Sequence, residues 1–165
     1  MDDLFSEAVG RICRGRSIHA QRTGILGVCL MRKWIRRIAL FAALVVICGL
    51  LLPENREMPV VGATASDWNA ESFWYEPWGS SGTHKGVDVF AQHGTPVQAG
   101  VGGFVVFSGR VEKGGNIVLI LGPKWRIHYY AHLDAITPNL GWVKRGDIVG
   151  SVGDSGNAVG KQPHL

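Results

Sequence analysis

The chain has 165 residues, 46% of them hydrophobic and 18% charged, which is enough for one domain of ordinary size with sequence to spare. Six tryptophans and the low share of charged residues exclude wholesale disorder. The net charge of +4 is concentrated in residues 1–37, which hold eight Lys/Arg against three Asp/Glu, whereas the remaining residues hold nine against ten. Because a nucleic-acid surface needs its positive charge on the folded domain, we expect no nucleic-acid partner.

The three cysteines, Cys13, Cys29 and Cys48, all lie in the first third of the chain. A secreted domain held together by disulfides is therefore excluded, and so is a cysteine-ligated zinc site in the later part. A metal ion there would have to be held by His, Asp or Glu.

We interpret residues 1–37 as a basic cytoplasmic tail. The next segment, Ile38–Leu52, is an uncharged, almost wholly apolar run. Arg36 and Arg37 precede the run and Pro53 closes it. As a helix it would measure about 22 Å, less than the roughly 30 Å hydrocarbon core of a bilayer. It fits a signal-peptide hydrophobic region or a short membrane anchor, and a buried core helix is the alternative. We favour an uncleaved anchor.

The positive charge on one side of this run places the part after Pro53 outside the cytoplasm. The expected location is the inner (cytoplasmic) membrane, with the domain on its periplasmic or extracytoplasmic side. Cleavage of the signal would instead release a secreted protein, and Ala63–Ala65 has the small-x-small pattern of a cleavage site. Met31 is a possible true start, because it opens a compact export signal.

Residues 53–65 mix charge, prolines and small residues without periodicity, which is typical of a linker. A domain is expected over 66–165. It opens with five aromatic residues that either complete the core or form one wall of a ligand groove: Trp68, Phe73, Trp74, Tyr75 and Trp78.

From Gly82 onward, short segments rich in Val, Ile and aromatic residues alternate with glycine turns, which predicts strands and hairpins. The expected strands are Thr95–Ala99, Gly103–Ser108, Asn116–Leu121, Arg126–Leu133 and Asp147–Val152. No stretch after residue 66 has an apolar period long enough for a helix of three turns. We expect a mainly β domain, a small antiparallel folded sheet or sandwich, following the N-terminal membrane helix.

Several His and Asp side chains that could bind a metal ion or act in catalysis lie in this β region. His84 and Asp88 would be about 13 Å apart on an extended chain, and Gly86 allows the turn that brings them together. His128 and His132 have the spacing of a zincin helix, but Tyr129 stands where the glutamate is required. On the expected strand, positions 128, 130 and 132 share one face.

Four segments in order carry a family resemblance: GTHKGVD (82–88), GTPVQA (94–99), YAHL (130–133) and GDIVGSVGDSGNAVGKQPHL (146–165). Together they resemble the M23 zinc metallopeptidases, the LytM and lysostaphin-like family. The resemblance covers about residues 79–165 and implies the family's duplicated, folded-sheet architecture. It also implies a Zn²⁺ cofactor and peptidoglycan peptides as substrate.

The resemblance assigns His84 and Asp88 to the first two zinc ligands, and His132 and His164 to catalytic histidines. The family's third ligand is the second histidine of a closing H-x-H, and the sequence stops one residue before it. A fragment or a truncated gene model is therefore expected, with impaired activity. His128 and His93 have no counterpart in the family motifs and are expected to be structural or on the surface.

The leading hypothesis is a zinc metalloendopeptidase that cleaves peptide bonds in peptidoglycan. The second is a catalytically inactive domain of the same kind that binds or activates other cell-wall hydrolases. A third is a biotinyl- or lipoyl-type carrier domain, because Val143–Val149 resembles the hairpins of such domains; the absence of a neighbouring methionine and the export signal argue against it.

Overall fold

The computed structural model describes residues 31–68, 70–77, 82–137 and 140–165. The chain divides into two compact units, with the boundary between Cys48 and Gly49. Most of the predicted cytoplasmic tail, residues 1–30, lies outside the described residues.

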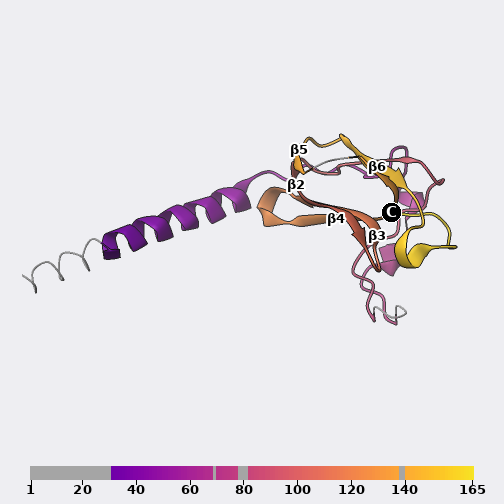
Figure 1. Cartoon of the computed structure of the whole chain (residues 1–165), viewed down its shortest axis with the longest axis horizontal. Coiled ribbons are helices and arrows are strands. Elements are labelled where there is room, and N and C mark those ends of the chain that lie inside the picture. The colour runs from indigo at the N-terminus through magenta and orange to yellow at the C-terminus, as the bar shows by residue number, and fades with distance from the viewer. Residues whose placement is uncertain (1–30, 69, 78–81, 138–139) are drawn as a thin grey trace, which may run out of the picture. The chain divides into compact units, whose positions relative to one another are not determined.

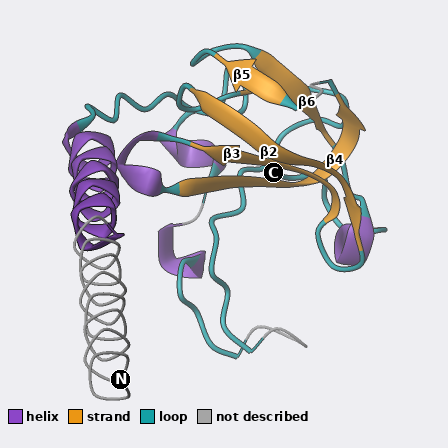
Figure 2. Cartoon of the chain, turned by 60° about the vertical axis from the view of Figure 1, so that its left-hand side comes forward, coloured by secondary structure: helices purple, strands orange, loops and turns teal. Residues whose placement is uncertain are grey.

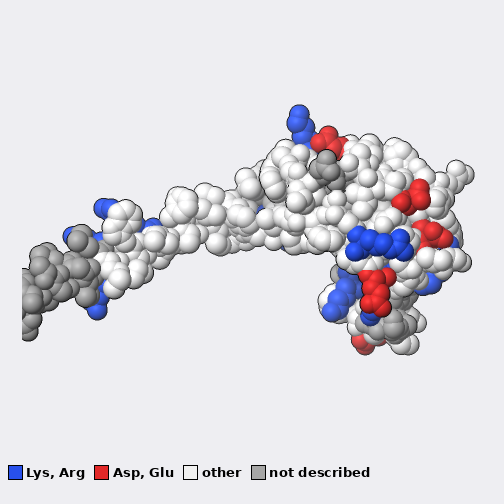
Figure 3. Space-filling view, in the orientation of Figure 1, with Lys and Arg blue, Asp and Glu red and all other residues white. Residues whose placement is uncertain are grey.

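The first described element is a helix over Met31–Leu51, long and apolar enough to cross a membrane by length and composition. At about 1.5 Å per residue its 21 residues rise about 31 Å, close to the thickness of a hydrocarbon core. The helix exceeds the apolar run predicted from the sequence because its basic first residues are helical too. Figure 3 shows Lys and Arg gathered at the beginning of the described helix, ahead of its uncharged remainder.

The second unit is built on a sheet of six strands: β1 (Pro96–Gln98), β2 (Gly103–Val111), β3 (Gly115–Leu121), β4 (Ile127–Ile136), β5 (Gly141–Val143) and β6 (Ile148–Val152). Their order across the sheet is β1-β6-β4-β3-β2-β5, and every neighbouring pair is antiparallel. The sheet is curled (Figures 1 and 2). The mainly β, antiparallel folded sheet predicted from the sequence is confirmed.

The core lies on one face of this curled sheet and consists mostly of valine with a few larger residues. Its fully buried members include Val97, Val105, Ile120, Leu133 and Val149, each with 0% exposure. They come from five different strands, so most of the sheet contributes to this core. After residue 66 the predicted absence of a long helix holds for the described residues, which form only short 3₁₀ turns besides the strands. The 3₁₀ turns of the second unit are Ala65–Asp67 (η1), Ala70–Ser72 (η2), Pro123–Trp125 (η4) and Gly156–Ala158 (η5).

The strand boundaries differ from the prediction mainly at β2, β4 and β5. β2 continues to Val111 and β4 to Ile136, each three residues past its expected end, and the added part of β4 pairs with β6. β5 was not expected, because three residues carry too little pattern to be recognised. Its Trp142 pairs with Phe104 of β2, at the far edge of the sheet from β1.

Part of the expected linker packs against the sheet. Val60 is 1% exposed and bridges Val97 in antiparallel fashion, while the Val61 amide donates to the Pro96 carbonyl at 3.0 Å. The Glu57 amide likewise donates to Gly100 at 2.9 Å. Residues 57–61 therefore cover the free edge of β1, and we call them the strap.

The aromatic segment divides between the two roles considered for it. Phe73, Trp74 and Tyr75 are all more than half exposed and do not complete the core. Trp68 is partly buried against the core, and it also lines the large pocket of this unit. Trp78 lies outside the described residues.

Candidate metal and catalytic site

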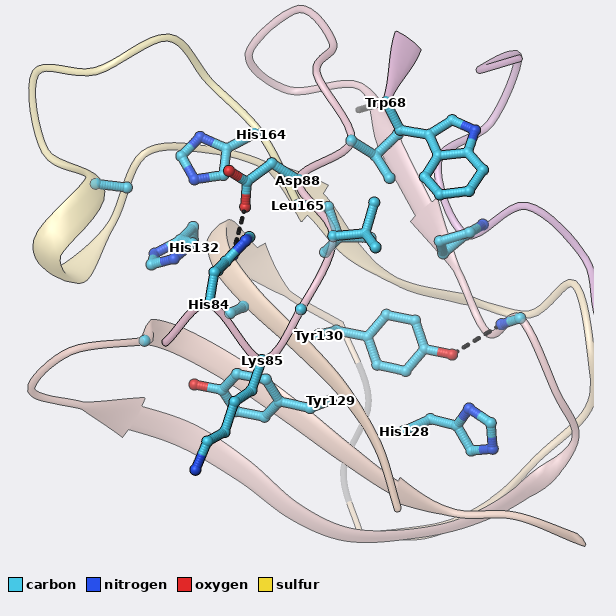
Figure 4. Close-up of a pocket in the computed structure, with 18 of the residues that line it drawn as sticks. Trp68, His84, Lys85, Asp88, His128, Tyr129, Tyr130, His132, His164 and Leu165 are labelled. Atoms are coloured by element: carbon cyan, nitrogen blue, oxygen red, sulfur yellow. Dashed lines mark hydrogen bonds and ion pairs between the residues drawn. The ribbon is translucent and has the colours of Figure 1, made fainter. Parts of the chain in front are cut away.

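A pocket of about 1190 Å³ opens on the second unit, and the fold brings four of the sequence-predicted site residues together in it. His84, Asp88, His132 and His164 gather at one end, whereas His128 lies toward the other end (Figure 4). The four come from loop 82–88, from β4 and from the C-terminal segment, so they meet only in the folded chain.

His84 is held in place by backbone pairing with the aromatic segment. The His84 amide donates to the Tyr75 carbonyl at 3.0 Å, and the Trp74 amide donates to the His84 carbonyl at 2.7 Å. The ring Nδ1 lies 2.9 Å from the Ser72 carbonyl oxygen, so Nδ1 carries the proton and donates. The opposite nitrogen, Nε2, is left as an acceptor.

This acceptor faces a second acceptor. Nε2 of His84 lies 3.1 Å from Oδ1 of Asp88, and both side chains are less than one-fifth exposed. Two facing acceptors need a cation between or beside them, either a proton or a metal ion. Donor atoms about 2.0–2.2 Å from a tetrahedral zinc are about 3.3 Å from each other, so the pair fits two positions of a zinc site.

His132 sits in an irregularity of β4. Val118 opposes Tyr130 and Asn116 opposes Leu133, so two residues of β4 stand against one of β3, which defines a β-bulge. His132 itself has φ +58°, a left-handed conformation unusual for a non-glycine residue. The expected simple alternation through 128, 130 and 132 is therefore wrong beyond Tyr130: Tyr130 and Leu133, three residues apart, both enter the core. The bulge turns the His132 ring toward the pocket.

Ser155 fixes this bulge and orients the histidine. Its Oγ accepts from the Asn116 amide at 2.9 Å and donates to the Leu133 carbonyl at 2.7 Å, bridging β3 and β4. Its carbonyl oxygen lies 2.8 Å from Nδ1 of His132. Burial lowers the pKa of His132 below its usual value, although the bond to Ser155 opposes the shift. A neutral ring with Nε2 free to accept a proton is the result at neutral pH.

His164 reaches the site because the C-terminal segment pairs on both sides. It bridges Phe90 on one side and Gly153 on the other, and the Leu165 and Val89 amides donate to each other's carbonyls at 3.0 Å. His164 is 8% exposed, and its ring Nδ1 lies 2.7 Å from the Gln162 carbonyl oxygen. The rings of His132 and His164 have centroids 4.9 Å apart.

All three histidines thus share one arrangement: Nδ1 bound to a backbone carbonyl and Nε2 left for the pocket. Backbone carbonyls of this kind fix ring orientation and tautomer at metal and catalytic sites. Within the described residues, however, no group of three or more His, Cys, Asp or Glu side chains converges closely enough to hold a metal ion by itself.

The two remaining histidines among the described residues, His93 and His128, behave differently from each other. His93 lies at the surface, 3.6 Å from Asp134, with about half of each side chain exposed. His128 lines the pocket, and its buried Nε2 has no hydrogen-bond partner among the described residues. Burial lowers the pKa of His128. Its nearest charge is Glu54, with Oε1 at 3.6 Å.

Glu54 was not expected to matter, because it stands in the predicted linker. Its side chain is only 4% exposed and accepts from Nη1 of Arg126 at 2.6 Å, with Arg56 at 3.1 Å on its other side. Although burial raises the pKa of Glu54, the charges of Arg126 and Arg56 outweigh it and hold that pKa below its usual value. No local sequence signal links residue 54 to residue 126.

Comparison with known proteins gives a consistent result. A model of peptidase family M23 matches residues 82–165. The DD-carboxypeptidase/endopeptidase Mpg of Neisseria meningitidis is 40% identical over 82 residues, which are 50% of this chain and 19% of the relative. The L-Ala--D-Glu endopeptidase of Bacillus subtilis is 34% identical over 110 residues, which are 61% of this chain and 34% of the relative. The chain thus spans a third or less of these relatives.

Solved structures show the same similarity. The catalytic domain of lysostaphin from Staphylococcus simulans is 31% identical with a TM-score of 0.53, over 62% of this chain and 82% of that one. A zinc-containing peptidase from Vibrio cholerae is 25% identical with a TM-score of 0.55, over 68% of this chain and 35% of that one.

Proposed function

Because this chain belongs to peptidase family M23, we propose that its second unit is a zinc endopeptidase that cleaves peptide bonds in peptidoglycan. The observation that carries the proposal is the convergence of His84, Asp88, His132 and His164 in one pocket, with each imidazole presenting Nε2. The relatives named for endopeptidase activity support the reaction class.

His84 and Asp88 would hold the zinc ion, because their facing acceptor atoms are spaced as two ligands of one ion. When bound, zinc lowers the pKa of its water toward about 7 and polarises the scissile carbonyl. His132 is neutral and takes a proton at Nε2, since Nδ1 already donates to Ser155. The His164 ring lies beside that of His132 and lines the same pocket, where it would contact the substrate.

How firmly the 165-residue chain would hold a zinc ion depends on how many protein ligands it supplies. A catalytic zinc uses three protein ligands and one open position, and the described residues supply His84 and Asp88. We propose that this chain loses zinc readily and hydrolyses peptidoglycan poorly. A histidine at position 166, followed by Phe-Glu to continue the strand, would restore both properties.

The test compares the 165-residue chain with this extended chain. Zinc per protein after dialysis and clearing of a cell-wall suspension are measured for both, and His84→Ala in the extended chain should abolish both. His93→Ala is the matched control, because His93 is exposed and outside the pocket. Full zinc content and activity in the 165-residue chain would overturn the ligand assignment.

A second candidate is an inactive domain that binds or activates other cell-wall hydrolases, and it is supported by the absence, among the described residues, of three converging metal-binding side chains. The extended chain separates the two functions. If it holds zinc and still does not clear cell wall, the binding role replaces the peptidase role.

For location, we propose that the helix Met31–Leu51 anchors the chain in the inner membrane through the apolar run Ile38–Leu52, of which all but the last residue is helical. The basic residues before the run then lie in the cytoplasm, and the second unit lies outside, where peptidoglycan is found.

A further inference from the structure

Strand β4 changes its neighbours halfway along its length. On one side it pairs with β3 from Ile127 to Leu133. On the other side β6 joins it only at Leu133 and Ile136. In the part of the chain that the structure describes, no other strand pairs with the first half of β4, so this half has one open edge.

The pairing of β4 with β3 determines which backbone groups of β4 point to the open edge. In an antiparallel pair, residues bonded to the neighbour alternate with residues whose N–H and C=O point away from it. The Gly122 amide donates to the Arg126 carbonyl at 2.8 Å, so Arg126 is a residue that bonds to β3. Every second residue after Arg126 does the same. His128 and Tyr130 therefore bond to β3, whereas the N–H and C=O of Ile127 and Tyr129 point away. No described residue supplies a partner for these four groups.

The open edge faces the pocket that holds the site. Side chains from both faces of β4 line it: Ile127 and Tyr129, which are about half exposed, and His128 and Tyr130, which turn inward. A pocket lined from both faces of one strand must run along the edge of that strand. In Figure 4 β4 runs through the pocket, with His132 toward the end where His84 and Asp88 meet.

We propose that the substrate peptide binds as an added strand along the open edge of β4, hydrogen-bonded to the backbone of Ile127 and Tyr129. The inference rests on the proposed peptidase function, because the edge leads directly to His132. Main-chain pairing supplies affinity without reading side chains. It therefore suits a cell-wall peptide of unusual residues.

The register also gives a length requirement. Tyr129 precedes His132 by three residues and Ile127 by five, which is about 10 and 17 Å on an extended strand. Peptide residues paired with these positions lie about three to five residues from the bond at the site. Peptides that end within two residues of that bond cannot reach the edge, and their binding should be weaker.

The experiment measures amide exchange by NMR in the full 165-residue chain in detergent, with and without saturating peptide. The probe is decaglycine, which is long enough to cover the site and to extend five residues along the edge. Exchange at Ile127 and Tyr129 should slow at least about tenfold, while exchange at His128 and Tyr130, already bonded to β3, stays unchanged. N-methylation of decaglycine at one alternate set of nitrogens should weaken binding about two- to tenfold per bond lost. Methylation of the intervening nitrogens should have no effect.

Binding without protection at Ile127 and Tyr129, or equal effects of all N-methyl groups, would overturn strand addition. Absence of decaglycine binding would overturn it as well. The proposed function is tested separately by zinc retention and cell-wall clearing in the extended chain. Clearing without edge protection would therefore refute only this inference.

Discussion

Ser155→Ala tests whether the Ser155 hydroxyl holds the bulge that places His132. The substitution removes one acceptor and one donor. It leaves the Asn116 backbone amide on β3 without a partner, whereas the Leu133 carbonyl on β4 keeps the bond that it accepts from Nδ2 of Asn116 at 3.0 Å. An unsatisfied buried group costs about 1–3 kcal/mol, and both lost bonds are only partly buried, so we take about 1 kcal/mol for the amide and about 0.5 kcal/mol for the carbonyl. The expected loss of unfolding free energy is about 1.5 kcal/mol, or a fall in Tm of roughly 5–8 °C.

Thermal unfolding followed by circular dichroism measures this loss. Ser151→Ala is the matched control, because Ser151 Oγ makes a longer, exposed bond of 3.3 Å to the Ala135 amide, and should cost about 0.5 kcal/mol or less. Because the Ser155 carbonyl bond raises the pKa of His132, loosening of this loop should also lower that pKa in an NMR titration. Equal Tm values for the two variants would show that the backbone alone holds the bulge.

Three further outcomes are expected. In the extended chain His132→Ala should reduce cell-wall clearing at least about 100-fold with zinc content unchanged, and His128→Ala should cost far less; equal losses would mean the wrong histidine is assigned. Burial lowers the pKa of His128 in the folded chain, so the unfolded chain binds a proton at His128 more tightly. The free energy of unfolding should therefore be highest above about pH 6.5 and decline below that pH. Denaturant midpoints from pH 8 to 5 should show this decline. His128→Gln should make it shallower, and the part that remains comes from His132, whose pKa burial also lowers; an unchanged slope would refute the assignment. A reporter fused after Leu165 should be active only outside the cytoplasm, whereas activity inside would reverse the topology.

The sequence was sufficient for the antiparallel β architecture, because apolar alternation between glycine turns is a local signal. The gathering of His84 and Asp88 was also expected, since the turn at Gly86 lies between them. A site role for His132 was expected from the family resemblance, whereas the local prediction of a regularly alternating strand around it was wrong. A bulge at 131–132 depends on Ser155, which lies 23 residues along the chain and bonds His132 through its backbone carbonyl.

Other features could not be predicted because they depend on contacts between distant segments. Val60 has no strand pattern around it and becomes buried only because the edge of β1 is available. The Glu54–Arg126 ion pair joins residues 72 positions apart. The free edge of β4 depends on where β6 stops pairing, which is set by the register of two strands and not by the composition of either.

The burial of Val60 also bears on proteolytic processing. A signal peptidase that cut after Ala65 would separate the strap from the domain by hydrolysing the chain only a few residues beyond Val60. The severed strap would still be paired with β1 and would keep its side chain in the core. Cleavage there would thus leave a two-piece protein joined by noncovalent contacts, and a recombinant domain starting at Ser66 would have an empty space in its core and an uncovered strand edge.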